Sequence, residues 1–144
     1  MPTFVPPYTV TVTSTAGGLS QCTYVDGNGL QVPPDALLTT STPTGQAGEL
    51  AINFTEAVVD GESLRLVGAA AKTVGNDPTM NPYNYLPATR AQAGDVWVDG
   101  VVIPWGPNNY TTRGVVLLFV QVNDAGDMVN FYPSADPQTQ NDER

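Results

Sequence analysis

Short stretches in which hydrophobic and polar residues alternate recur along the chain and predict β-strands. Residues Tyr8–Ser14 read YTVTVTS, and Glu49–Thr55 alternates in the same way through Leu50, Ile52 and Phe54. A period of two is typical of a strand that buries one face and exposes the other. We therefore expect half-buried strands at both ranges.

The stretch Gly114–Tyr132 carries a long apolar run followed by a turn. Val115–Val122 is apolar at almost every position and rich in valine, Asn123–Gly126 supplies turn residues, and apolar residues resume in Asp127–Tyr132. A short continuous apolar run predicts a strand buried on both faces. β-Branched residues favour this strand over a helix. We expect a β-hairpin here, with its first strand central in the core.

Asp-Gly pairs that follow a valine mark turns at three places: Asp26-Gly27, Asp60-Gly61 and Asp99-Gly100. Asp-Gly is among the strongest short-range hairpin signals. In Asp95–Ile103, DVWVDGVVI, we expect Asp99-Gly100 to be a two-residue turn that joins two strands. Further short strands are expected at Gln21–Val25, Leu30–Val32, Leu37–Thr40, Ala57–Val59 and Leu64–Gly68.

About seven to nine short strands, frequent turns and no convincing helix predict an all-β, antiparallel β-sandwich or barrel. Jelly-roll and immunoglobulin-like topologies both fit this pattern. We expect one domain over residues 8–132. Three prolines in residues 1–7 predict an extended N-terminal arm, and the polar residues 133–144 predict a frayed C-terminal tail.

Two aromatic-bearing loops are predicted before the hairpin. Gly75–Gly94 has no periodic pattern, and Pro104–Tyr110 is rich in proline and asparagine. Aromatic side chains in loops stack on sugar rings, anchor protein interfaces or cover one end of a core. All three roles stay open for the loop aromatics, which are Tyr83, Tyr85, Trp105 and Tyr110.

The charge and composition narrow the choice of partner. Fourteen acidic residues face five basic ones, for a net charge of −9, which argues against binding a nucleic-acid backbone. Charged residues make up 13% of the chain, against about 25% in ordinary soluble domains. A surface with few charges is easier to bury against another protein. The sequence has no apolar run of the roughly 20 residues that span a membrane. Its first residues do not resemble a secretory signal, so we expect synthesis inside the cell.

No catalytic or metal-binding constellation stands out. The chain has no histidine and one cysteine, Cys22, which we expect to be a buried inert thiol. The carboxylate pairs Asp95/Asp99 and Asp124/Asp127 lie at predicted turns, where aspartate is an ordinary turn former. An EF-hand match at Asp26 fails because the closing glutamate is absent. Calcium held between several loops stays open, and no cofactor is expected.

The proline-rich start Met1–Pro7, the acidic β domain with few charges, the long loops and the polar end Pro133–Arg144 together resemble the small β-sandwich decoration (cement) proteins of tailed bacteriophage heads. The resemblance lies in the character of the whole chain, and no residue motif carries it. It implies a non-enzymatic virion subunit on the outer capsid surface that bridges neighbouring coat proteins and often forms homo-oligomers. Neither nucleic acid nor membrane is an expected partner.

A binding role would fall on the arm, the loops and the end of the hairpin. The alternative is a carbohydrate-binding module, lectin-like or from a fibre tip, that uses the loop aromatics. A small glycosidase is a third, disfavoured alternative because no acid–base pair is evident. The expected protein-binding residues are Phe4, Pro6, Pro7, Tyr83, Tyr85, Trp105, Tyr110 and Tyr132.

Overall fold

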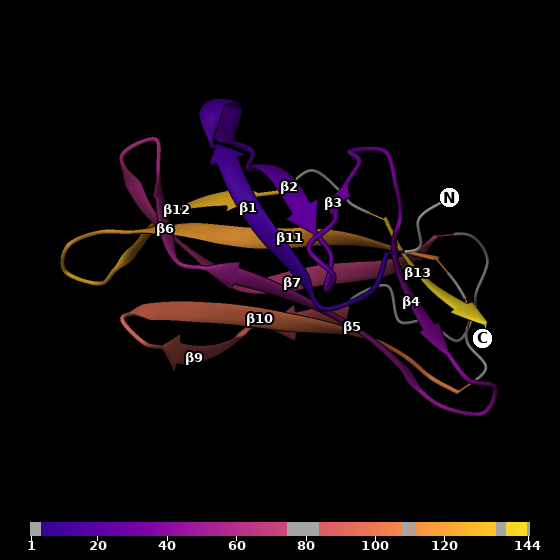
Figure 1. Cartoon of the computed structure of the whole chain (residues 1–144). Helices are drawn as coiled ribbons and strands as arrows, with labels where there is room; N and C mark the ends of the chain where they lie inside the picture. Colours follow the sequence, from indigo (N-terminus) through magenta and orange to yellow (C-terminus); the bar gives the residue numbers. More distant parts are fainter. Residues whose placement is uncertain (1–3, 75–83, 108–109, 111, 135–137, 144) are drawn as a thin grey trace.

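Two mixed β-sheets pack face to face in a sandwich-like, all-β fold (Figure 1). The computed structural model describes residues 4–74, 84–107, 110, 112–134 and 138–143. These residues form thirteen strands and one short 3-10 turn, η1 (Ala16–Gly18). Within this described part, no helix is long and apolar enough to cross a bilayer.

One sheet has six strands. Its neighbours are antiparallel except β1 and β5, which run parallel. The order across the sheet is β3 (Gln31–Val32), β2 (Gln21–Val25), β1 (Tyr8–Ser14), β5 (Gly48–Thr55), β10 (Val96–Trp105) and β9 (Thr89–Ala93).

The second sheet has seven strands and is centred on β11. Its path runs β4 (Leu38–Thr42), β13 (Gln138–Glu143), β11 (Thr112–Val122), β7 (Glu62–Val74) and β6 (Ala57–Val59). Two further strands lie beside this path: β12 (Met128–Pro133) pairs with β11, and β8 (Asn84–Pro87) pairs with β7. β13 and β4 run parallel. The two parallel pairs, one in each sheet, depart from the purely antiparallel sandwich that the sequence predicts.

The hydrophobic core lies between the sheets and is filled by every second residue of the long strands. Phe54 of β5 and Phe119 of β11 meet edge to face, with ring centroids 5.0 Å apart. The largest buried side chains are Trp105, Tyr8, Phe54, Phe119, Leu38, Leu50, Ile52, Leu64, Leu66, Ile103 and Leu117.

The alternation patterns place the strands correctly. Tyr8–Ser14 forms β1 with alternating buried and exposed residues, and Gly48–Thr55 forms β5 in the same way. The predicted hairpin is confirmed as β11 and β12, which pair antiparallel. Asn123 closes its turn, because its backbone N–H donates to the Asp127 carbonyl and its side chain accepts from the Asp127 N–H.

The predicted turn at Asp99-Gly100 is wrong, because Val96–Trp105 is one continuous strand. Gly100 pairs with Asn53 on one side and Thr89 on the other, so both edges of β10 continue through it. The Asp99 side chain bonds to groups from other strands instead of capping a turn. The same dipeptide does turn the chain at Asp60-Gly61, where both residues adopt positive φ.

Two segments expected to lack regular structure contain strands. Within the predicted loop Gly75–Gly94, residues 84–87 form β8 and residues 89–93 form β9, while residues 75–83 lie outside the described part. The predicted polar tail contains β13, which pairs with β4 and β11. Figure 1 shows β13 beside β4 at one end of the sandwich, away from the β9–β10 and β11–β12 turns.

The described part of the predicted arm is held against the domain. Phe4 packs against the core, and its carbonyl accepts from the Thr39 hydroxyl at 2.8 Å. The Val5 N–H donates to the Asp26 carboxylate at 3.1 Å, and the Val5 carbonyl accepts from the Gly27 N–H. These residues therefore belong to the fold instead of extending away from it.

Candidate binding surfaces

Strand β11 is apolar on both faces, but only one face lies in the core. Val115, Leu117 and Phe119 are completely buried between the sheets. The residues between them point to the other side of the seven-stranded sheet. Val120 is buried there, while Val116, Leu118 and Val122 stay only half-buried.

Strand β12 extends this outer side with three exposed apolar residues. In register, Phe131 lies opposite Val120 and Met128 lies opposite Val122. A bulge at this point inserts Val129, and a bulge places two successive residues on the same side of a strand. Met128, Val129 and Phe131 are 50%, 45% and 59% exposed. Residues 128–131 also form a sheet edge, since β12 pairs with β11 alone among the described strands.

Tyr85 of β8 adds an aromatic ring on the same side. Its hydroxyl donates to the Val67 carbonyl at 3.1 Å, and its ring lies over Gly68, where a Cβ atom would collide with it. Gly68 is the register partner of Leu118, whose side chain points outward. The absence of a side chain at Gly68 therefore leaves room for the hydroxyl end of Tyr85, which is 51% exposed.

These residues form one surface, which we call the outer apolar face. One charged residue, Arg65, is the register partner of Val120 on this side. Exposed apolar residues on a sheet face and at a sheet edge are typical of protein association sites. The outer apolar face consists of Tyr85, Val116, Leu118, Val120, Val122, Met128, Val129 and Phe131.

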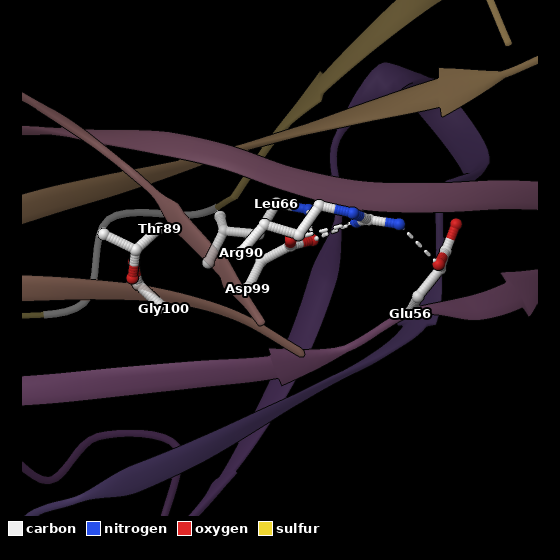
Figure 2. Close-up of polar contacts among 6 residues, drawn as sticks. All are labelled: Glu56, Leu66, Thr89, Arg90, Asp99 and Gly100. Carbon is white, nitrogen blue, oxygen red and sulfur yellow. Dashed lines mark hydrogen bonds and ion pairs between the residues drawn. The ribbon is translucent and has the colours of Figure 1, made fainter. Parts of the chain in front are cut away.

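A second feature is a polar cluster at one end of the core (Figure 2). Arg90 donates from Nη1 to both oxygens of Asp99, at 3.0 and 3.3 Å, and from Nη2 to Glu56 Oε2 at 2.8 Å. Asp99 is 1% exposed and also accepts from the Leu66 N–H at 3.1 Å. Arg90 lies over the ring of Trp97, 4.7 Å from its centroid.

Strand alternation explains why these groups meet. The buried series of β10, which includes Val101 and Trp105, continues outward to Asp99 and then Trp97. Arg90 is the register partner of Asp99 on β9. Glu56 lies just beyond β5, and its backbone N–H donates to the Trp97 carbonyl at 2.9 Å. The polar cluster thus lies at the end of the buried series of β10 and links the two sheets, since Asp99 of β10 accepts from the Leu66 N–H of β7.

A groove of about 300 Å³ lies beside this cluster. Trp97 is 38% exposed there, and Glu56, Asp95 and Ser63 supply polar atoms. The groove is lined by Glu56, Ala57, Val58, Ser63, Asp95, Val96 and Trp97.

The predicted binding residues differ in how far they are buried. Trp105 is not in an exposed loop: it ends β10 and is 1% exposed, with the Arg113 guanidinium over its ring. Tyr110 is half-buried. Tyr132 packs against the core and donates to Glu62 Oε1 at 3.2 Å. The hydrogen bond to Glu62 and, to a lesser degree, burial raise the pKa of Tyr132.

Of the other predicted residues that the structure describes, only two present much surface. Tyr85 lies on the outer apolar face, and Pro7 is exposed. Phe4 packs against the core and Pro6 is half-buried. Tyr83 lies outside the described residues.

Sequence reasoning missed Trp97 and the three exposed residues of β12. A signal for β12 was present, because Met128 and Val129 are consecutive apolar residues and interrupt the alternation that a half-buried strand shows. Such an interruption is compatible with a bulge. Trp97 carried no comparable signal, since its position depends on the pairing of β9 with β10.

Two further polar groups, the Cys22 thiol and the Asp26 carboxylate, have shifted pKa values. Cys22 is half-buried instead of fully buried as expected, and burial raises the pKa of its thiol to about 12, which disfavours the reactive thiolate. Asp26 accepts backbone N–H groups from Leu30, Val5 and Asn28. Burial by itself would raise the pKa of Asp26. The three hydrogen bonds lower it by more, so the pKa lies below its ordinary value. In the described part of the chain, no three His, Cys, Asp or Glu residues are grouped to hold a metal ion.

Comparison with known proteins adds no relative to this picture: no protein-family model, curated protein or solved structure matches the chain.

Proposed function

We propose that this chain is a non-enzymatic structural subunit that binds other protein subunits through the outer apolar face. One observation carries the proposal. β11 is apolar on both sides, as expected of a strand that is covered on both sides, but the chain covers the outer side only in part: Val120 is buried there, whereas Val116, Leu118 and Val122 are half-buried. A partner protein would supply the missing cover.

The energetics favour a protein as the partner. Full burial of a large apolar side chain contributes about 1.5–3 kcal/mol, and Met128, Val129 and Phe131 are each about half exposed. Association costs at least about 4 kcal/mol in lost freedom, so a few such residues offset much of that cost. Few charges on this face have to be desolvated, since among the described β7 register partners of its β11 residues Arg65 is the charged one.

In its finer form, the proposal is a decoration subunit of a tailed-phage head that binds coat protein and sits on the outer capsid surface, with self-association as a further contact. Its support is the resemblance in whole-chain character and the net charge of −9, which disfavours contact with packaged DNA. Contact through a free arm and tail loses support, because Phe4 and β13 are engaged with the domain itself. The outer apolar face takes their place.

Co-sedimentation tests the proposal. Heads of the phage that encodes the chain, prepared without it, are mixed with the purified protein and pelleted. Wild-type protein is expected in the pellet. Phe131→Asp is expected to stay in the supernatant, because it places a charge in the contact. Val102→Asp, an exposed valine of the other sheet, is the matched control and should pellet normally.

Two results would count against the proposal. The wild-type protein could fail to pellet while folded, or Phe131→Asp could pellet as well as wild type. Circular dichroism of each variant separates a lost contact from a lost fold.

A further inference from the structure

The groove at the end of the sandwich combines an aromatic surface with fixed hydrogen-bonding groups. Trp97 lines it, and Arg90 covers one face of the Trp97 ring at 4.7 Å from the centroid. Arg90 is in turn held by Asp99 and Glu56. The cation that lies over the ring is therefore held in place before a ligand arrives, which reduces the entropy lost on binding.

Glu56 is a prepared acceptor at the same place. Its Oε2 binds Arg90, while Oε1 has no partner among the described residues. Asp95, from the β9–β10 turn, and Ser63, from β7, also line the groove. Carboxylates accept hydrogen bonds, and a hydroxyl both donates and accepts, so the groove can satisfy several ligand hydroxyl groups at once.

The charges of the cluster select a neutral ligand. A cationic ligand at Trp97 would meet the Arg90 guanidinium, which already lies over the ring and pairs with Glu56 and Asp99, so Asp95 is the lining carboxylate that Arg90 does not pair. An anionic ligand would approach Glu56, Asp95 and a chain of net charge −9. A neutral molecule with one apolar face and a rim of hydroxyl groups fits both constraints.

We propose that this groove binds a neutral saccharide, with a sugar ring against Trp97 and its hydroxyl groups on Glu56, Asp95 and Ser63. The groove shares no residue with the outer apolar face, although Ser63 is the register partner of Val122, so it goes beyond the structural role proposed above. A glycan on a cell surface or on another particle would be its source. Aromatic rings pack their apolar bodies against ligands while polar neighbours fix the orientation.

The test is an array of neutral mono- and oligosaccharides, followed by calorimetric titration of the best-bound glycan. Wild-type protein is expected to bind at least one neutral glycan. Trp97→Ala should reduce the affinity at least tenfold, and Glu56→Gln should weaken it by removing the charged acceptor. Phe131→Asp should bind the glycan like wild type, which keeps this site distinct from the protein-binding face. Circular dichroism and thermal melting confirm that each variant is folded.

Three results would overturn the proposal. Folded wild-type protein could bind no neutral glycan on the array. Trp97→Ala could retain full binding, which would place any sugar elsewhere. A tri-lysine peptide could bind in place of glycans and lose its binding in Trp97→Ala, which would make the groove a site for cationic partners.

Discussion

At the scale of single residues, two buried aspartates are stabilised in different ways. Asp26 is surrounded by its own turn and the incoming N-terminal segment, and it accepts three backbone N–H groups. Asp99 lies in the middle of a strand and relies on a cation from the neighbouring strand. Both aspartates precede glycine in the sequence, so only the structure distinguishes the local network from the long-range one.

The lowered pKa of Asp26 predicts that its contribution to stability depends on pH. Its folded-state pKa is lowered, so the stabilisation is present above the ordinary carboxyl pKa and is lost as the pH falls through the lowered value. Asp26→Asn should therefore be less stable than wild type at pH 7, and the difference should narrow as the pH falls below about 4. Urea unfolding across a pH series measures this, and a difference that does not change with pH would refute it.

The two ion pairs of Arg90 should contribute unequally to the free energy of unfolding. Arg90→Ala leaves the buried Asp99 carboxylate without its cation and should cost about 3 kcal/mol. Glu56→Gln removes only the more exposed partner and should cost about 0–1 kcal/mol. Urea unfolding of both variants at one pH gives the comparison, and equal losses would contradict this account of the cluster.

At the scale of elements, apolar periodicity predicted the central strands well, and local turn residues predicted the connections unevenly. The alternation in Tyr8–Ser14 indicates which residues of β1 face the core, and the apolar run in β11 indicates a central strand. Asp60-Gly61 and Asp99-Gly100 share a sequence but not a conformation, because Asp99 finds Arg90 on a strand that the dipeptide does not specify. β13 is polar and has no apolar pattern, and its backbone pairing is what defines it as a strand.

Removal of β13 tests its role as a structural strand. A chain that ends at Ser134 loses the pairing with β4 and β11, together with the bond from the buried Thr139 hydroxyl to the Arg113 carbonyl. At about 0.5–1.5 kcal/mol for each net hydrogen bond, we expect a loss of at least about 3 kcal/mol. Thr139→Val removes one hydroxyl and should cost about 1 kcal/mol. Denaturant unfolding measures both, and an unchanged midpoint after truncation would show that β13 is dispensable.

At the scale of the whole molecule, an acidic chain with few charges presents one apolar sheet face and one polar groove. The class of fold was predictable from strand periodicity alone. The candidate surfaces were not, because they depend on which strands become neighbours. The bulge in β12 brings Met128 and Val129 to one side, and the pairing of β9 with β10 brings Arg90 over Trp97. Trp105, expected on a loop, fills the core instead.

The most direct test of the central claim is thiol labelling at the outer apolar face in the free and the bound protein. Val129 and Val102 are both 45% exposed valines, one on the outer apolar face and one on the other sheet, so Val129→Cys and Val102→Cys form a matched pair. Cys22 should contribute little background, since burial raises its thiol pKa to about 12.

Each variant is labelled with a maleimide, first free in solution and then after mixing with the phage heads that we propose it binds. We predict that binding slows labelling of Val129→Cys at least tenfold and leaves Val102→Cys unchanged. Equal labelling rates for Val129→Cys in the free and the bound protein would contradict the claim that the outer apolar face is the interface.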